Sequence, residues 1–564
     1  MRITTAGLLL TAFSAMLSLQ AADDVVMNAM RDEMTRSMQQ LHLENLEKPY
    51  FISYRVVEHE NAGVSASFGS LSNSSEGRSR MLMVEVRVGD YKFDNSHFFS
   101  YSFDAGSFQN FNGMKQLPLE DDYKELRRQI WLATDATYKK AVEDYSKKKA
   151  TLQNKNQDDE IPDFTKENPV ITSDELPPVR VDRAKWEAEA RNLSALFRKM
   201  PGINTSRVGF SAITTYTRYL NSEGTTYSRR QPSVIFDANA ATQAADGGTL
   251  DDFIWFHGRS LTDLPSEQEL ASRIQVLGRS LTDLRGASTL ANYNGPVLVE
   301  GEAAAQIFRL AFLPNLLGTR RIISDMPNAQ GMGNQAENPF IDRIGARVLP
   351  EFLSVTDNPT IAEYNKLRME GAYKVDEDGM PARETRLVEK GVLKTLLTSR
   401  DPVRGIEHTT GSRHAGQAAP SNVIVTAENG LSDADLRAKF LELVKQRNRP
   451  FGILVRRMRN VNNPVLAYKV FPDGHEELIR GVQFSDLNAA SFKEILAASK
   501  SQNTLTVQYR PRNQFPMMAM MMSEENYAPV TLVVPSLLFE DANLRKIRAE
   551  SPNPPVAGHP FFDK

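Results

Sequence analysis

Apolar residues near the start of the chain follow a helical spacing, and those after them alternate as in strands. Between Val26 and Leu41 the apolar positions recur every three or four residues, as on one buried helix face. From Tyr50, and again from Arg80, apolar and polar residues alternate, which predicts two half-buried strands. The stretch between them, GSLSNSSEGRS, is rich in Gly, Ser and Asn, so we expect it to form a loop.

The segment from Asp121 to about Lys155 is predicted to form one long amphipathic helix. Its apolar positions lie mostly three or four residues apart, with charged residues between them: Tyr123, Leu126, Ile130, Tyr138, Val142 and Tyr145. We expect the basic run Lys147–Lys149 to lie on the solvated face of this helix. The polar segment that follows contains several prolines up to about residue 180, which predicts a surface linker.

The second half of the chain consists mainly of strand-like segments bounded by turn residues, from AYKVDEDG at Ala372 to APVTLVVPSLLFED at Ala528. Helical patterns interrupt it near Ala434–Gln446 and Ala489–Ala498. We therefore predict an α+β fold with two domains. The first, residues 23–290, is α+β with a helical insertion and linker near 121–180, and the second, residues 291–564, is β-rich and antiparallel.

Residues 1–22 have the features of a secretory signal peptide. A positive charge at Arg2 precedes an apolar run from Ala6 to Leu19 and the small residues Ala21 and Ala22. We therefore expect export, with the bacterial periplasm as the destination. The apolar run is shorter than the roughly 20 residues that cross a bilayer, and no later stretch is long and apolar enough, so we expect no transmembrane anchor.

Composition and charge narrow the class of protein. Hydrophobic residues make up 41% and charged residues 24% of the chain, as in soluble globular proteins. Lys plus Arg number 67 against 70 Asp plus Glu, so no overall positive field favours nucleic acid. The chain has no cysteine, which excludes disulfides, a lipoprotein anchor, thiolate metal ligands and a thiolate nucleophile.

The stretch GPVLVEGEAAAQIFRLAFLPNLLG, residues 295–318, is predicted to be a buried strand that leads into a helix. Catalytic residues often lie at such junctions, yet this helix contains no His, Cys or Ser. Its composition therefore predicts a packed helix without the usual nucleophiles or metal ligands.

Seven stretches, in order along the chain, resemble exported members of the TldD/PmbA family. They are IWLATDATYKKAVEDYSKKKATL, LPSEQEL, GPVLVEGEAAAQIF, RLVEKGVLKTLLTSR, TTGSRHAGQAAPSNVIV, IRGVQFSD and VVPSLLFED. Members of this family were once described as modulators of DNA gyrase and are now regarded as metallopeptidases. The resemblance implies an N-terminal α+β domain, a β-rich C-terminal domain, and a dimer that encloses a chamber in which an extended peptide is cleaved.

In catalytic members of the family, the helix after the GPVLVEG-like strand carries H-E-x-x-x-H, and a C-terminal cysteine completes a zinc site. Two histidines one turn apart hold the ion, and the glutamate activates a bound water. The matching helix here shows residues such as Leu310, Ala311 and Pro314, and the cysteine is absent. The resemblance is therefore to the non-catalytic PmbA (TldE) type, for which we expect no catalytic residue and no metal or cofactor of its own.

Such a subunit would pair with a catalytic TldD-type subunit, which would carry the zinc, or form a homodimer. Its expected ligand is a peptide. The loop TTGSRH has glycine flexibility beside Arg413 and His414, which suits contact with peptide backbone or a carboxylate. We take Arg413, His414, Glu300 and Glu302 as candidate substrate-binding residues, with a solvated loop as the simpler interpretation of TTGSRH.

Two other functions remain open on the sequence alone. The chain could be an active metallopeptidase with displaced zinc ligands, drawn from His408 and His414, from His59 and its flanking carboxylates, or from Glu300 and Glu302. Alternatively, the methionines in Met517–Met522 could bind copper(I) in a periplasmic module, because soft sulfur ligands select that ion. An adaptable apolar loop that lines a chamber or contacts a partner is the simpler interpretation of this cluster.

Overall fold

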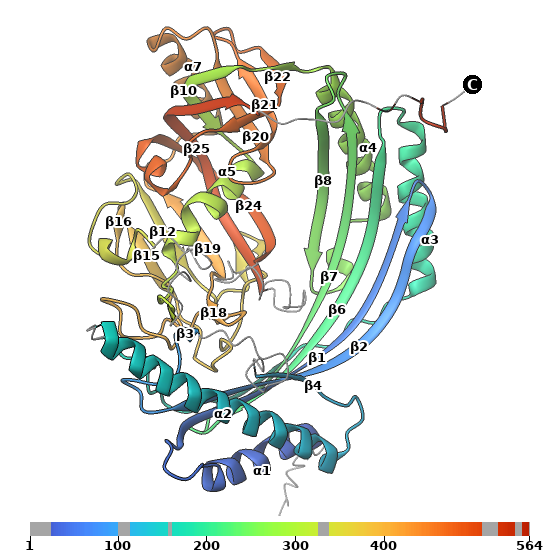
Figure 1. Ribbon diagram of the computed structural model, residues 1–564. Helices are drawn as coiled ribbons and strands as arrows, with labels where there is room; N and C mark the ends of the chain where they lie inside the picture. The colour runs from blue at the N-terminus through green and yellow to red at the C-terminus, as the bar shows by residue number, and fades with distance from the viewer. Residues whose placement is uncertain are drawn as a thin grey trace, which may run out of the picture.

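The computed structural model describes residues 24–99, 113–155, 161–324, 338–509, 528–547, 555 and 557–562. Two large sheets dominate it: a long, curved sheet, and a β-rich body that lies against the concave side of that sheet (Figure 1). The predicted signal peptide, residues 1–22, and the cluster Met517–Met522 lie outside the described residues. No helix in the described ranges has the length and apolar character that crossing a bilayer requires.

The curved sheet has seven strands and is built from the first half of the chain. Its order is β4 (Met114–Gln116), β2 (Ser70–Val88), β1 (Pro49–Ser67), β6 (Thr205–Asn221), β7 (Thr226–Gln243) and β5 (Ile171–Glu175), and β8 (Thr249–Gly258) also pairs with β7. β5 and β8 pair with different stretches of β7, Thr226–Arg230 and Val234–Gln243 respectively. The pairing therefore leaves residues 231–233 of β7 between the ends of two neighbouring strands.

The predicted loop between the first two strands is wrong. β1 and β2 form one long hairpin whose turn is Phe68–Gly69, and the pairing begins at once with Ser67 opposite Ser70. The polar stretch is held by side chains as well as by backbone pairing. Ser72 Oγ lies 2.9 Å from Ser65 Oγ, and Ser74 Oγ donates to the Glu187 carboxylate at 2.8 Å.

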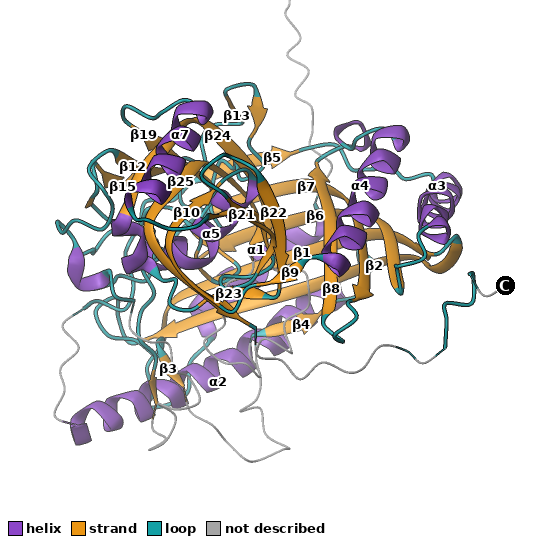
Figure 2. Ribbon diagram, turned by 90° about the horizontal axis from the view of Figure 1, so that it is seen from above, coloured by secondary structure: helices purple, strands orange, loops and turns teal. Residues whose placement is uncertain are grey.

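Four helices cover the curved sheet on the side away from the β-rich body (Figures 1 and 2). They are α1 (Val25–Gln40), α2 (Tyr123–Lys155), α3 (Arg183–Ala195) and α4 (Glu267–Gly286). The predicted helices at 26–41 and 121–155 are thus confirmed. Side-chain caps fix helix starts: the Asp24 carboxylate accepts from Met27 N–H before α1, and Ser266 Oγ accepts from Glu269 N–H before α4.

The solvated basic run and the surface linker are only partly correct predictions. Lys148 is fully buried in α2, and its Nζ donates to the Asp163 carboxylate at 2.6 Å and to the Ser96 carbonyl at 2.9 Å. Asp163 and Phe164, in the segment expected to be a surface linker, are 1% and 2% exposed. Arg320 also pairs with Asp163 at 3.1 Å, so this segment is anchored beneath α2 by charge pairing.

The β-rich body contains a twelve-stranded sheet. Its order is β16 (Val392–Leu393), β15 (Thr385–Glu389), β12 (Leu353–Asp357), β19 (Asn422–Ala427), β25 (Ala528–Lys546), β10 (Asn292–Val299), β20 (Gly452–Met458), β21 (Pro464–Val470), β22 (Glu476–Arg480) and β9 (Ser288–Thr289), with β23 (Val482–Phe484) and β24 (Ile495–Tyr509) paired to β25. Most neighbours are antiparallel, and the predicted α+β fold is confirmed.

The two helices expected in this half have different outcomes. The first is α7 (Asp433–Gln446), which starts at the Ser432 cap and buries Leu436 and Phe440. The second is only a short 3-10 turn, Ala489–Glu494, because β24 begins at Ile495 and pairs with β25. Pairing with a buried central strand therefore overrides the helical spacing of the sequence at 495–498.

Candidate functional site

The helix that follows β10 is irregular and deeply packed. It consists of α5 (Glu302–Ile307), a π-helical turn η4 (Phe308–Phe312) and a 3-10 turn η5 (Leu313–Leu316) with Pro314 in its first turn. The aromatic rings of Phe308 and Phe312 pack against Phe492, with ring centroids 6.0 and 5.1 Å apart. This segment therefore serves as the apolar core beneath β20, β24 and β25.

Arg309 is the one basic side chain on this helix. Its Nε is buried without a hydrogen-bond partner, and no ion pair to it occurs within the described residues. Burial lowers the pKa of this guanidinium below its usual range. A fixed cation repels a metal ion, so Arg309 makes the helix less suited to zinc than apolar residues alone would.

The residues present do not fit a zinc ion. All eight histidines of the chain lie in the described ranges, and the chain has no cysteine. Across those ranges, no group of three or more His, Cys, Asp or Glu side chains could hold a metal. His408 is exposed, whereas His414 is 7% exposed and His59 pairs with Thr215 Oγ1 at 3.1 Å.

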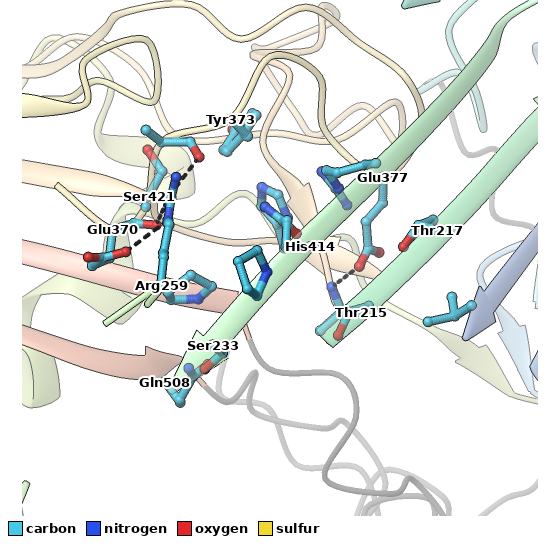
Figure 3. A pocket seen from close by; sticks show the side chains of 18 of the residues that line it. Thr215, Thr217, Ser233, Arg259, Glu370, Tyr373, Glu377, His414, Ser421 and Gln508 are labelled. Atoms are coloured by element: carbon cyan, nitrogen blue, oxygen red, sulfur yellow. Dashed lines mark hydrogen bonds and ion pairs between the residues drawn. The ribbon is translucent and has the colours of Figure 1, made fainter. Parts of the chain in front are cut away.

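A polar cleft lies where the curved sheet faces the β-rich body (Figure 3). One wall comes from β1, β6, β7 and β8, and the other from loops at 370–377 and 414–421 and from the ends of β24 and β25. The space open to the centres of water molecules is about 130 Å³. The neutral polar side chains that line it are Thr215, Thr217, Gln231, Ser233, Ser421 and Gln508.

An ion pair between Arg55 and Glu377 crosses the cleft. Arg55 of β1 lies 2.7 Å from the Glu377 carboxylate, which also accepts from the backbone N–H groups of Ala415 at 2.8 Å and Gly416 at 3.1 Å. Burial alone would raise the pKa of Glu377, but Arg55, the nearby His414 and the Ala415 N–H lower it to about 2. Glu377 is therefore ionised, and its acceptor sites are occupied.

A second pair of the same polarity crosses the cleft at β8. Arg259 Nε lies 2.9 Å from the Glu370 carboxylate, and its Nη2 donates to the carbonyls of Glu370 at 2.7 Å and Ala372 at 3.3 Å. In both pairs the arginine comes from the curved sheet or directly follows it, since Arg259 comes just after β8, and the glutamate belongs to the β-rich body. Burial raises the pKa of Glu370, and the nearby Arg259 and Arg368 oppose this shift.

His414 lies inside the cleft, where its ring meets the Tyr373 ring edge-on, with centroids 4.5 Å apart (Figure 3). Its Nε2 is buried and has no hydrogen-bond partner within the described residues. Burial lowers the pKa of His414 to about 4, so the ring is neutral near pH 7. The conformation of this loop requires glycine at position 411. Gly411 has a φ of 68°, and an added Cβ would lie 2.5 Å from the Pro381 carbonyl oxygen.

Arg413 points away from the cleft, because it neighbours His414 on the short strand β17 (Arg413–His414). Its guanidinium lies 3.2 Å from the Asp378 carboxylate and 3.9 Å from that of Asp401. Asp401 in turn pairs with Arg87 of β2 at 3.1 Å. Arg413 is thus part of a buried charge network that joins the two halves of the molecule.

Glu300 and Glu302 lie elsewhere, at the start of α5. Glu300 pairs with Arg456 at 2.6 Å, while Glu302 accepts from Gln306 at 2.8 Å and lies 3.8 Å from Arg457. Arg457 also pairs with Asp252 of β8 at 2.7 Å, another link between the two sheets. Of the four candidate residues, the structure therefore brings only His414 to the cleft.

Among the cleft residues that the sequence did not single out are Arg229 of β7 and His257 of β8. Arg229 Nη1 donates to the Val375 carbonyl at 3.0 Å, and its Nε is buried without a partner. His257 Nε2 lies 3.0 Å from Ser233 Oγ, and burial lowers the pKa of this ring to about 4. Both lie on strands in which apolar and polar residues alternate. That pattern predicts a sheet but does not distinguish these two residues from their neighbours.

Comparison with known proteins assigns the β-rich body. A model of the PmbA/TldA metallopeptidase C-terminal domain matches residues 293–546. Residues 293–546 therefore form a domain of the TldD/PmbA family. A metalloprotease of Methanocaldococcus jannaschii is 37% identical to this chain over 67 residues, which are 12% of the chain and 14% of that relative.

A second relative, a metalloprotease of Methanothermobacter thermautotrophicus, is 30% identical over 131 residues, which are 20% of this chain and 27% of the relative. The chain thus matches well under two thirds of the length of these curated relatives. The fold extends further: TldE from Thermococcus kodakarensis aligns with a TM-score of 0.56 and 14% identity over 92% of this chain and 99% of that structure.

Proposed function

We propose that this TldD/PmbA protein is a catalytically silent subunit that binds an extended peptide in the cleft and completes the chamber of a zinc-peptidase partner. The apolar packing of the helix after β10 carries the proposal, because a family metallopeptidase requires metal ligands there. The second support is the cleft itself. Its walls supply neutral hydrogen-bonding groups, which suit the backbone of a peptide.

The zinc content of the purified chain tests the silent character. After zinc supplementation and removal of free metal, elemental mass spectrometry is expected to find far less than one zinc per chain. About one tightly held zinc per chain would overturn the proposal. Peptide binding is measured separately, by fluorescence anisotropy with short labelled peptides, so that a silent subunit is distinguished from an inactive preparation.

The partner is the second part of the proposal. A TldD-type subunit with an intact H-E-x-x-x-H is expected to form a complex with this chain and to cleave peptides faster in the complex than alone. Size-exclusion chromatography with light scattering distinguishes this heteromer from a homodimer. We place the assembly in the periplasm on the basis of residues 1–22, and cell fractionation tests that placement.

The alternative, a metallopeptidase with displaced ligands, has two cleft histidines to draw on, although the described residues place no group of three metal-ligating side chains there. His257 and His414 both line the cleft, and each has a buried ring nitrogen without a partner, Nδ1 and Nε2 respectively. In that case His257→Ala and His414→Ala would each abolish both metal binding and hydrolysis. A chain that keeps both properties in either variant would rule the alternative out.

A further inference from the structure

The cleft contains one more arginine than its carboxylates can pair with. Arg55, Arg229 and Arg259 line it together with Glu370 and Glu377. Glu377 pairs with Arg55, and Glu370 pairs with Arg259. Because His257 and His414 are neutral near pH 7, the cleft has a net charge of one positive unit, located at Arg229.

Arg229 is held in place without a counter-ion. It is 7% exposed, its Nη1 donates to the Val375 carbonyl at 3.0 Å, and its guanidinium carbon lies 5.5 Å from the centre of the Tyr227 ring. No ion pair joins it to any acid in the part of the chain that the structure describes. A buried cation of this kind is stabilised when a carboxylate binds to it.

The carboxylates nearest in the cleft are not free to move to Arg229. Glu377 is bound by Arg55 and by two backbone N–H groups, and Glu370 by Arg259 and by Arg368 at 3.0 Å. Among the described residues no other carboxylate lines the cleft, so an anion that pairs with Arg229 is expected to come from a bound ligand. A guanidinium presents two parallel N–H groups, a geometry that matches a carboxylate.

His414 adds a second unsatisfied group on the same wall. Its Nε2 is buried without a partner, although the residue is 7% exposed and lines the cleft. A neutral imidazole has one N–H donor and one acceptor nitrogen, so it can donate to a bound oxygen. The edge-on Tyr373 ring fixes the orientation of the imidazole.

We propose that the cleft recognises a carboxylate of its peptide ligand, with Arg229 as the paired cation and His414 as a neutral hydrogen-bond partner. This inference rests on the proposed peptide-binding function and adds the class of group that is recognised. Two sources share this chemistry, the free C-terminus of a peptide and an Asp or Glu side chain. The surrounding Thr215, Thr217 and Ser233 side chains are available to the neighbouring backbone.

The test compares three pools of short peptides, each labelled at the N-terminus and randomised over uncharged residues. The first pool has a free C-terminal carboxylate, the second a C-terminal amide, and the third the amide with one glutamate at a fixed position. Fluorescence anisotropy with the full chain is expected to show binding of the free-acid pool about tenfold tighter than of the amide pool. Equal affinity of the first two pools and no gain in the third would overturn the carboxylate proposal.

The third pool identifies the source, because tight binding there assigns recognition to an acidic side chain. If all three pools bind equally, peptide binding stands and only the carboxylate inference fails. If no pool binds, the proposed function fails as well.

A substitution at Arg229 localises the effect. Arg229→Gln is expected to remove the difference between the acid and amide pools, whereas the neighbouring Arg230→Gln is expected to keep it. Arg230 faces the other side of β7, where it pairs with Glu175 at 3.2 Å and covers the Tyr216 ring. If Arg229→Gln does not fold, Arg229→Lys serves instead. Lysine keeps the positive charge but lacks the two parallel N–H groups, so the difference in affinity between the acid and amide pools is expected to decrease. An acid preference that survives unchanged in the folded Arg229 variant overturns the assignment.

Discussion

Arg55 and Glu377 form a 2.7 Å ion pair that joins β1 of the curved sheet to the β-rich body. The pair lies at one wall of the cleft, and Arg259 with Glu370 forms a matching pair at β8. These contacts set the spacing of the two cleft walls. The cleft therefore lies where the curved sheet and the β-rich body meet, and its geometry depends on charged side chains from both parts.

Removal of one member of this pair is expected to destabilise the fold strongly. Arg55→Met leaves the buried Glu377 carboxylate without its cation, at a cost of about 3 to 5 kcal/mol in the free energy of unfolding. The double variant Arg55→Met with Glu377→Leu is expected to lose less, because no charge is left unpaired. Urea denaturation followed by circular dichroism measures both. Equal losses in the single and double variants would contradict this account.

The buried His414 predicts a pH dependence of stability. Its pKa is about 4 in the folded chain against the ordinary value of 6.5, because burial disfavours the charged ring. Between these values the unfolded chain binds more protons, so the stability due to this residue is complete above pH 6.5 and falls as the pH decreases toward 4. The full effect is about 3 kcal/mol, and His414→Gln is expected to remove it from the pH profile of urea unfolding.

Asp357 predicts the opposite slope. Burial raises the pKa of its carboxyl to about 6 from 3.8, even though Ser421 donates to it through N–H at 2.8 Å and Oγ at 2.7 Å. The folded chain then binds the extra proton, so the stability due to Asp357 is complete below pH 3.8 and is lost as the pH rises through 6. Asp357→Asn is expected to remove a slope of this sign. Identical profiles for the Asp357 and His414 variants would refute both assignments.

The basic run in α2 offers a matched pair of substitutions. Lys148→Met removes the buried partner of Asp163 and is expected to cost about 3 kcal/mol or more. The adjacent Lys149 is exposed, so Lys149→Met is expected to change stability by no more than about 0.5 kcal/mol. Thermal melts of the two variants against the parent chain measure the contrast. Similar melting temperatures for both would show that the Lys148 contact contributes little.

The sequence makes Glu300 and Glu302 candidates for substrate binding, but neither residue lines the cleft, so we expect neither to contribute to peptide affinity. Their carboxylates face Arg456, Arg457 and Gln306 outside the cleft lining. Glu300→Gln and Glu302→Gln are therefore expected to leave the affinity for short labelled peptides within about twofold of the parent value. A larger loss in a folded variant would extend the binding site to the start of α5.

The sequence predicts elements well where the pattern is local. The helix expected from Asp121 to Lys155 is observed as Tyr123–Lys155, because its apolar spacing continues without a break. The loop expected at residues 69–79 is instead part of β2, since its polar residues are held by β1 and by Glu187 of α3. No pattern within the segment itself records those distant partners.

The site was harder to predict for the same reason. His414 could be selected from its loop, but Arg229 lies in an ordinary strand and becomes notable only because Glu377 pairs with Arg55 instead. Lys148 belongs to a basic run that the sequence predicts to be exposed to solvent. Its burial is explained by the hydrogen bonds that its Nζ donates to Asp163, Asp94 and Ser96. Charge pairing between distant segments decides these positions, and spacing along the chain does not encode it.

The π-helical turn at Phe308–Phe312 bears on the evolutionary history of this helix. In an α-helix, side chains four residues apart share one face, whereas a π turn bonds each residue to the fifth one along and shifts that alignment. The histidines of an H-E-x-x-x-H motif lie five residues apart, a spacing that a π turn can bring onto one face, so the obstacle to metal binding lies in the side chains of this helix, Pro314 among them. A metal centre on this helix would therefore require several substitutions at once, because the chain also lacks the cysteine ligand.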